Sequence, residues 1–244
     1  AYGDLVINEL MIDPTPVVGL PPYDLPEAEY IELYNRLSWP VDLEGWQLRI
    51  GDRAFVLPSA FLAGQSYLVL TAEELVTSFG DTLQVIGVDM PQTVLLNSGA
   101  KVELLDPSGQ HISAVDYAPG FYQNQLKSQG GWSLERINAQ ALCQGMINWR
   151  ASKSRRGGTP GQVNSLDSSL VFQGGFRVMD ILLPSDRELA LRFSLDLTAA
   201  PDTDLFTISP TLPISAVEFR EGLMSEVTIT LGDRLKSGVL YSLI

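Results

Sequence analysis

The alternation that decides the fold runs through Glu29-Tyr30-Ile31-Glu32-Leu33-Tyr34. Ile31 and Leu33 share one face of an extended chain, and the other residues share the opposite face, because side chains alternate with a period of two in a strand. Similar strand-forming segments are residues 5–11, 46–50, 66–70, 101–105 and 112–117. The turn Asp106-Pro107-Ser108-Gly109 joins the last two as a hairpin. Many short strands without alternating helices predict an all-β sandwich.

Three local predictions refine this fold. Residues 71–79 are the one helix candidate, with Thr71 as its cap and Glu73 and Glu74 at its positive end. Trp46 follows Gly45 at the start of a strand, where an indole fills the middle of a sandwich. Asn8 and Asn35 lie at the ends of apolar strands, so we expect their amides to bond loop backbone.

The 244 residues divide near Ser165 to Ser169. Residues 150–165 contain four basic side chains, no acid and the loop-forming run Gly157-Gly158-Thr159-Pro160-Gly161. Strand patterns then resume at residues 176–183, 188–197, 206–208, 215–219, 226–231 and 240–244. We therefore expect two Ig-like β-sandwich domains in tandem, residues 1–166 and residues 167–244.

The chain ends carry expectations of their own. The second domain has roughly 75 residues, fewer than the about 100 of an Ig-type domain. Its strand pattern runs to Ile244, and the chain begins at Ala1 without a Met or a signal peptide. We expect a processed or truncated chain whose natural protein continues beyond Ile244.

Charge and composition exclude several function classes. Lys and Arg total 16 against 29 Asp and Glu, a net charge of −13 that repels nucleic-acid phosphates and anionic lipid. We therefore expect no nucleic-acid partner, and no apolar run reaches the roughly 18 residues of a membrane-spanning helix. Cys143 is the only cysteine and is expected to be a buried structural thiol. His111 is the only histidine and is expected to be solvated after its hairpin turn, so a catalytic set with a histidine would have to use it.

Several blocks of sequence resemble those of a known family. They are residues 6–11, 29–35, 41–48, 62–70, 96–104, 132–136, 148–149 and 158–164. In this order and spacing, residues 1–165 resemble a lamin tail domain of the kind found in bacterial surface and secreted proteins. The resemblance implies an Ig-like sandwich and does not imply an enzyme. Residues 189–243 are similar to bacterial Ig-like modules.

The chain departs from the nuclear lamins. It has no heptad rod, basic localisation segment or prenylation box, so chromatin binding is not carried over from the fold. We expect a non-catalytic module that is exported and lies at the cell surface, associated with the outer membrane or in the periplasm. Its expected partner is a protein or polysaccharide, with no membrane insertion by this chain. The alternative is an accessory binding or spacer region of a larger surface hydrolase whose catalytic domain lies outside this chain.

One acidic segment suggests a metal site. Residues 1–35 hold seven acids and no base, and a proline-rich loop at residues 13–27 separates two strands. Ca²⁺ takes six to eight oxygen ligands, and Asp13, Asp24, Glu27 and Glu29 can converge at the mouth of this loop. These residues are the predicted calcium ligands, and a solvated acidic loop is the alternative.

A basic segment has the opposite character. Arg150, Lys153, Arg155 and Arg156 form a basic loop. The loop is either solvated, docked on the acidic edge of the same protein, or able to bind an anionic ligand.

Overall fold

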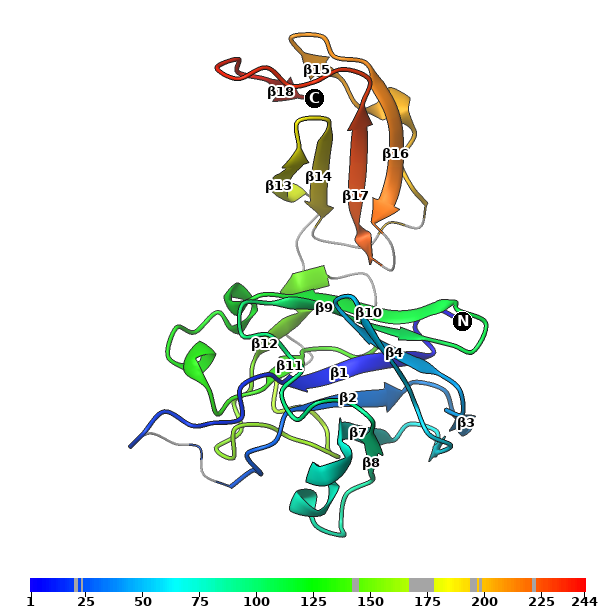
Figure 1. Cartoon of the computed structure of the whole chain (residues 1–244), viewed down its shortest axis with the longest axis vertical. Helices are drawn as coiled ribbons and strands as arrows, with labels where there is room; N and C mark the ends of the chain where they lie inside the picture. The colour runs from blue at the N-terminus through cyan, green and yellow to red at the C-terminus, as the bar shows by residue number, and fades with distance from the viewer. Residues whose placement is uncertain are drawn as a thin grey trace. The chain divides into compact units, whose positions relative to one another are not determined.

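The computed structural model describes residues 1–19, 22, 24–141, 145–166, 178–193, 197, 199–220 and 223–244. The chain forms two compact units (Figure 1). Unit 1 contains the described residues 1–141 and 146–166, and unit 2 contains those from residue 178 onward.

The first sheet of unit 1 has six strands in the order β12-β11-β1-β2-β7-β8. Their bounds are β1 (Leu5–Met11), β2 (Tyr30–Asn35), β7 (Tyr67–Ala72), β8 (Val85–Val88), β11 (Leu134–Arg136) and β12 (Trp149–Ala151). Neighbouring strands are antiparallel except β7 and β8, which are parallel. The sheet therefore joins segments from both ends of unit 1.

The second sheet of unit 1 has four antiparallel strands in the order β10-β9-β4-β5. Their bounds are β4 (Gln47–Ile50), β5 (Arg53–Val56), β9 (Ala100–Leu105) and β10 (His111–Tyr117), and a small pair consists of β3 (Val41–Asp42) and β6 (Phe61–Leu62). The strand predictions for unit 1 are confirmed to within two residues. The Asp106 turn is also confirmed, since its carboxylate accepts the N–H groups of Ser108 and Gln110 at 2.9 and 3.0 Å.

The core lies between the two sheets. Leu5, Ile7 and Leu33 of the first sheet pack in one buried cluster with side chains of the second sheet, including Leu48 and Leu104. Trp46 belongs to this cluster with 9% of its surface exposed, which confirms its predicted place in the core.

The helix prediction is corrected by the structure. Glu73–Phe79 forms a 3-10 helix, η1, and the residue at its N-cap position is Ala72, which makes no side-chain cap. Thr71 lies in β7 opposite Gly87 of β8, and its hydroxyl donates to the Glu29 carbonyl oxygen at 2.8 Å. Thr71 cannot cap the helix because the parallel β7–β8 ladder already holds it. The other short helices of unit 1 are η2 (Pro119–Tyr122), η3 (Lys127–Gln129) and η4 (Gly145–Asn148).

The side chains of Asn8 and Asn35 have different kinds of hydrogen-bond partner. The Asn35 amide donates to three loop carbonyl oxygens, at Trp39, Leu62 and Ala63. This pattern confirms its prediction. The Asn8 amide donates instead to the side chains of Glu32 and Asn164, each at 2.9 Å. The prediction for Asn8 is wrong because its side chain bonds other side chains, those of Glu32 and Asn164, rather than loop backbone.

Unit 2 contains one antiparallel sheet in the order β13-β14-β17-β16 and a pair β15-β18. The bounds are β13 (Val178–Ser185), β14 (Glu188–Phe193), β15 (Ile208–Ser209), β16 (Ile214–Arg220), β17 (Leu223–Leu231) and β18 (Ser242–Leu243), with a 3-10 helix η6 (Thr203–Leu205). Leu191, Val227 and Ile229 form its buried centre. The predicted strands of unit 2 are present, although residues 176–177 and 194–196 of those predictions lie outside the described residues. Unit 2 is thus a β domain.

A buried ionic group braces the sheet of unit 2. Glu226 on β17 is 2% exposed and contacts Arg192 on β14 at 3.1 Å and Arg220 on β16 at 2.8 Å. The single carboxylate therefore ties three strands together.

In the described residues, no helix is long and apolar enough to cross a membrane.

Candidate functional site

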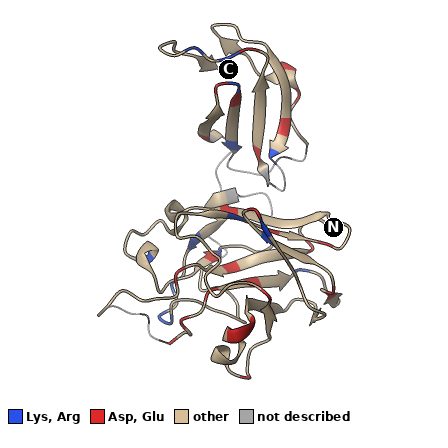
Figure 2. Cartoon of the chain, in the orientation of Figure 1, with Lys and Arg blue, Asp and Glu red and all other residues tan. Residues whose placement is uncertain are grey.

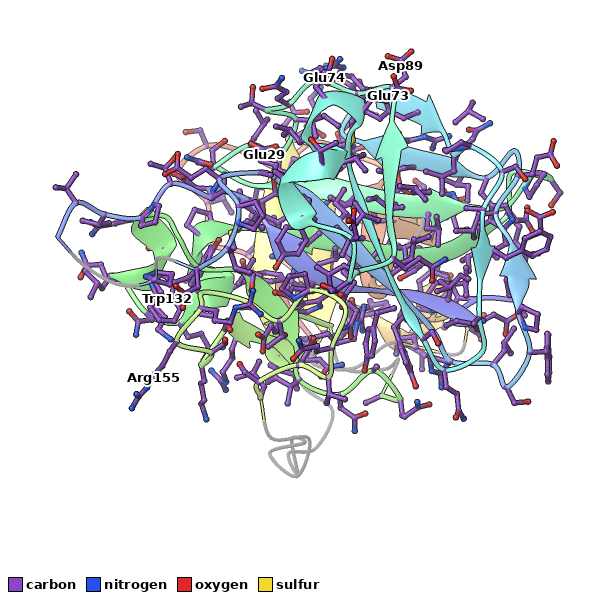
Figure 3. The ribbon with its side chains drawn as sticks, turned by 90° about the horizontal axis from the view of Figure 1, so that it is seen from below. Glu29, Glu73, Glu74, Asp89, Trp132 and Arg155 are labelled. Carbon is purple, nitrogen blue, oxygen red and sulfur yellow. The ribbon has the colours of Figure 1, made fainter. Side chains whose placement is uncertain are left out.

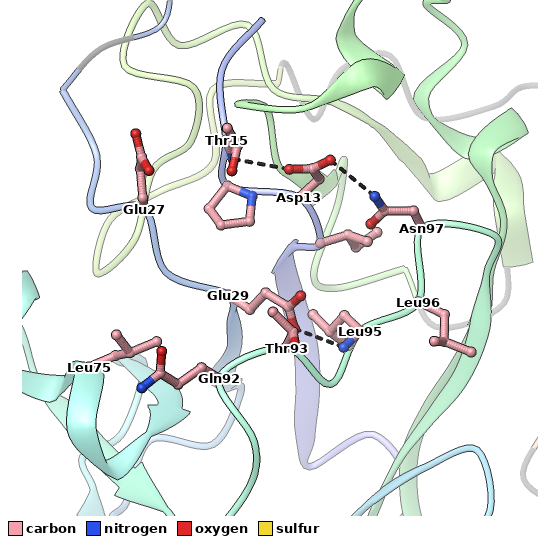
Figure 4. A pocket seen from close by; sticks show the side chains of 12 residues that line it. Asp13, Thr15, Glu27, Glu29, Leu75, Gln92, Thr93, Leu95, Leu96 and Asn97 are labelled. Atoms are coloured by element: carbon pink, nitrogen blue, oxygen red, sulfur yellow. Dashed lines mark hydrogen bonds between the residues drawn. The ribbon is translucent and has the colours of Figure 1, made fainter.

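Three of the four predicted calcium ligands line one pocket of unit 1 (Figure 4). The pocket has a volume of about 440 Å³, and Asp13, Glu27 and Glu29 contribute carboxylates to its wall. Asp24 is exposed and does not line it. Its carbonyl oxygen instead accepts a bond from Arg156 at 3.4 Å. The structure therefore brings together three of the four residues.

Glu29 is held rigidly at this pocket. It precedes β2, its side chain is 6% exposed, and its Oε2 accepts the backbone N–H groups of Val94 and Leu95 at 2.7 and 2.8 Å. Burial raises the pKa of Glu29 above 4.5, the two N–H donors oppose that rise, and the negative charge of Asp13 adds to it. The backbone thus fixes one oxygen of a poorly solvated carboxylate.

Asp13 is also engaged by neighbouring groups. Its two oxygens accept the Thr15 N–H at 3.1 Å and the Asn97 amide at 3.0 Å. Ca²⁺ would need six to eight oxygens around it. In the part of the chain that the structure describes, no group of three or more His, Cys, Asp or Glu residues is placed to hold a metal ion. The calcium site stays a prediction.

The predicted basic loop lies elsewhere on unit 1. Lys153, Arg155 and Arg156 are exposed, and Arg150 is half-buried. In the view of Figure 3, Arg155 and Trp132 lie toward the edge opposite Glu73, Glu74 and Asp89. Arg156 donates to the backbone carbonyl oxygen of Asp24, which joins the basic loop to the acidic segment at one point, and the three interpretations of this loop stay predictions.

A cluster of charged side chains surrounds His111. Its Nδ1 lies 3.0 Å from Glu103 Oε1, and the Lys101 ammonium lies 2.9 Å from the same oxygen. His111 is therefore partly buried on the outer face of the second sheet rather than freely solvated, because β9 and β10 place it beside Glu103. Cys143 lies outside the described residues.

Sequence reasoning missed a row of three buried glutamates. Glu9 on β1 pairs with Glu135 on β11 and with Glu32 on β2, and none of the three side chains is exposed to solvent. In-register positions of neighbouring strands place side chains on the same face about 5 Å apart. One feature of the sequence pointed to this row, namely that Glu9 and Glu32 each stand inside a predicted strand beside an apolar residue.

A covering segment, residues 157–165, shields this row from solvent. Gly161 N–H donates to Glu32 Oε2 at 2.5 Å, and Ser165 N–H and hydroxyl donate to Glu135 Oε2 at 2.8 and 2.7 Å. Thr159 N–H donates to Glu9 Oε1 at 2.9 Å, and the Tyr30 hydroxyl donates to the same oxygen at 2.6 Å. The three carboxylates thus serve as acceptors that hold the covering segment on the sheet.

One hydroxyl bridges two carboxyl groups of the row. Thr159 Oγ1 lies 3.1 Å from Glu9 Oε2 and 3.0 Å from Glu135 Oε1, yet a hydroxyl has a single proton to donate. Both contacts are hydrogen bonds when one of the two carboxyl groups is protonated and donates to Thr159, which then donates to the other. Burial and the charge of Glu135 raise the pKa of Glu9 to about 7, in agreement with this arrangement.

The other members of the row respond to the same environment. Burial, and then the charge of Glu9, raise the pKa of Glu32 well above 4.5. The pKa of the Tyr30 hydroxyl is also raised well above 10 by burial and by Glu9. Tyr30 therefore stays a hydrogen-bond donor to Glu9. The row is a buried acceptor site whose oxygens bond the covering segment and Tyr30.

The facing sheets of unit 1, closed by the covering segment, define an Ig-like β-sandwich. Residues 1–119 match the family described as Lamin Tail Domain, so the chain contains a lamin tail domain. The match leaves unit 2 without a family, and residues 120–166 also lie outside it, although β11 and β12 complete the first sheet. No curated protein matches the chain.

Proposed function

We propose that the chain is a non-catalytic structural or interaction module that is exported and works at the cell surface, in the periplasm or in association with the outer membrane. One observation carries the proposal. The three carboxylates that the first sheet of unit 1 brings together are fully buried and bond the chain's own covering segment. Carboxylates used in this way hold a fold together and do not face a substrate.

The proposed partner is a protein or a polysaccharide. Acidic side chains occur on both units (Figure 2), and the net charge of −13 opposes binding to nucleic acids. We further propose that unit 2 is an Ig-like sandwich, since Ile208 of the β15-β18 pair lies in the same buried cluster as Leu191 and Val227 of the four-stranded sheet. A solved structure in which β15 and β18 do not belong to a second facing sheet would contradict this assignment.

The second candidate function is an accessory binding or spacer region of a larger surface hydrolase. The β character of both units favours it equally, because β modules commonly position other domains. The two candidates differ in the chain that surrounds these units in the full gene product. Further β modules or a sorting signal favour the first candidate, and a catalytic domain favours the second.

Surface labelling tests the proposed location. An epitope tag is inserted between Gly51 and Asp52, in the exposed turn joining β4 and β5, in the full-length gene of the native host. We expect antibody labelling of intact cells, or of cells with an opened outer membrane. Labelling only after lysis of the inner membrane would contradict export.

An activity screen tests the absence of catalysis. The purified chain is incubated with peptide, ester, phosphodiester and glycoside substrates. We expect no turnover above buffer. Turnover that disappears in a variant with a single acidic residue replaced would overturn the non-catalytic assignment.

A further inference from the structure

The covering segment, residues 157–165, lies on a row of three buried glutamates that belong to the chain's own first sheet. We propose that this segment is a pH-sensitive latch: it is held closed while Glu9 and Glu135 share a proton through Thr159, and it opens, with the sandwich still folded, after that proton is lost. The inference concerns the purified chain and does not depend on where the protein works. Its failure would therefore leave the proposed surface role untouched.

The bridge at Thr159 supplies the first reason. Its Oγ1 lies 3.1 Å from Glu9 Oε2 and 3.0 Å from Glu135 Oε1, and the hydroxyl has one proton to donate. A second proton, on one of the two carboxyl groups, completes both hydrogen bonds. When that second proton is lost, one of the two contacts brings oxygen lone pairs together with no hydrogen between them. The closed arrangement is therefore matched to the protonated row.

The donors around the row supply the second reason. In the described part of the chain, the hydrogen bonds to the three glutamates come from backbone N–H groups, hydroxyl groups and the Asn8 amide, all of them neutral. Neutral donors do not cancel the repulsion between buried carboxylates that stand about 5 Å apart. Water can solvate the additional charge only if the covering segment moves away, because the side chains are otherwise buried.

Other titratable groups stand around the row. They are Tyr30 of β2, Tyr67 of β7, Lys127 of η3 and Arg150 of β12, whereas the covering segment itself contains no titratable side chain. Arg150 stands opposite Glu135 in the β11–β12 ladder, so its positive charge lies at the Glu135 end of the row. Burial, and then the charge of Glu135, raise the pKa of Glu9 to about 7. The shared proton is therefore lost near neutral pH.

The apolar packing of unit 1 supplies the third reason, because it does not depend on the covering segment. Among the described residues, the buried hydrophobic clusters of unit 1 contain none from residues 157–165, and Val163 is 77% exposed. A segment that is attached by hydrogen bonds with few apolar contacts opens at a lower free energy than the core. Opening therefore leaves the two sheets packed and exposes an acidic strip on the first sheet.

Amide hydrogen exchange of the ¹⁵N-labelled chain, followed by NMR at a series of pH values, measures this opening. Rates are divided by the intrinsic exchange rate at each pH, which leaves protection factors. The closed state binds the proton more tightly than the open state, in which Glu9 is solvated and has a pKa near 4.5. Protection at Thr159, Gly161 and Ser165 should therefore fall about tenfold for each pH unit between about pH 5 and pH 7, and stay constant above that.

A low concentration of urea separates local opening from global unfolding. Local opening exposes little surface, so about 1 M urea should leave the protection of the covering segment unchanged. Amides of the core, such as Leu33 and Leu68, should be more protected than the covering segment at every pH and should lose protection in urea.

Matched variants identify the groups that carry the proton. Glu9→Gln cannot ionise, so at about pH 8 its covering segment should keep at least about tenfold more protection than that of wild type. Glu74→Gln removes an exposed acid on η1 and should follow wild type. Thr159→Val removes the bridging hydroxyl and keeps the backbone N–H, so it tests the latch if Glu9→Gln does not fold. We expect it to lower the protection of Gly161 and Ser165 at about pH 5 more than at about pH 8, because the wild type has lost the shared proton at the higher pH.

Three results would overturn the inference. The first is protection of the covering segment that does not change with pH. The second is protection equal to that of the core amides and equally sensitive to urea, which would mean that the segment opens only by global unfolding. The third is a folded Glu9→Gln whose covering segment loses protection with pH as wild type does.

Discussion

Replacing Glu9 by glutamine should change how the stability of unit 1 depends on pH, because glutamine has nearly the same shape as glutamate and does not titrate. A glutamine oxygen at the position of Oε1 still accepts from Tyr30 and Thr159. Its amide nitrogen at the position of Oε2 donates to Thr159 Oγ1, as protonated Glu9 does, and leaves the Thr159 proton for Glu135. Glu9→Gln therefore resembles the protonated wild type at every pH.

The magnitude follows from the pKa of Glu9. Burial and Glu135 raise this pKa from 4.5 to about 7 in the folded chain, so the folded state binds more protons than the unfolded state between these values. The free energy of unfolding contributed by Glu9 is complete below about pH 4.5, falls as the pH rises toward 7, and is constant above that. Each unit of pKa difference corresponds to about 1.4 kcal/mol. The raised pKa of Glu9 therefore lowers the free energy of unfolding by about 3 kcal/mol at high pH.

Urea unfolding followed by tryptophan fluorescence measures this loss. Unit 1 contains all four tryptophans of the chain, so their emission reports unit 1 alone: Trp39, Trp46, Trp132 and Trp149. We expect similar stabilities for wild type and Glu9→Gln near about pH 4.5, and a more stable Glu9→Gln by about 3 kcal/mol near about pH 8. Since the two proteins differ only at residue 9, their difference reports the charge of Glu9 together with its effect on Glu32.

Glu44→Gln is the control, because Glu44 is exposed and outside the row. Its stability should track that of wild type at every pH. A stability difference between Glu9→Gln and wild type that stays constant from acid to alkaline pH would refute the reasoning. So would a Glu9→Gln protein that is less stable than wild type at about pH 8, because the row would then need the charge.

Further predictions concern packing, unit 2 and metal binding. A Cβ at Gly158 would lie 2.5 Å from Glu9 Oε1, so Gly158→Ala should destabilise unit 1 by about 2 kcal/mol or more in urea unfolding. A Cβ at Gly120 would have no neighbour within 4 Å, so Gly120→Ala is the control and should change the stability little. Equal effects of the two substitutions would contradict this prediction. Trp149 is 2% exposed, and Trp149→Ala should lower the free energy of unfolding by about 3–5 kcal/mol in chemical denaturation followed by circular dichroism; a loss under about 1 kcal/mol contradicts its core role. Glu226→Gln leaves two arginines without their carboxylate and should lower the melting temperature of unit 2 in thermal unfolding followed by circular dichroism. The tryptophan transition of unit 1 should not change, and an unchanged melt of unit 2 contradicts the bracing role. If the acidic pocket holds calcium, the ion at a hundredfold excess over its dissociation constant should stabilise the wild type by about 2.7 kcal/mol. Magnesium should stabilise it less, and Glu29→Gln should lose the effect of calcium. Equal melting temperatures with chelator, calcium and magnesium would contradict the calcium prediction.

The sequence by itself determined the strands and the class of fold. The strands at residues 5–11 and 29–34 could be predicted from local composition and alternation. The alternation of side chains along a strand is a property of the backbone and does not depend on the rest of the fold. The Asp106 turn and the core place of Trp46 were predictable for the same reason, since each depends on neighbouring residues in the chain. The lamin tail resemblance was likewise readable from the order of short blocks, and the family match confirms it over residues 1–119.

Only the tertiary structure decided what the outer face of the first sheet does. Alternation puts Glu32 on the face opposite Ile31 and Leu33, and the sequence alone predicts that this face is exposed to solvent. In the structure, Gly161 and the rest of the covering segment bury it. Glu135 lies more than a hundred residues beyond Glu9 and Glu32 along the chain, and the three side chains meet through strand register. The same holds for Thr71, which a parallel ladder removed from its predicted cap, and for Asp24, which the loop turned away from Glu29. Burial and the charge of neighbours set pKa values and ligand sites, and both depend on contacts between distant segments that no local pattern encodes.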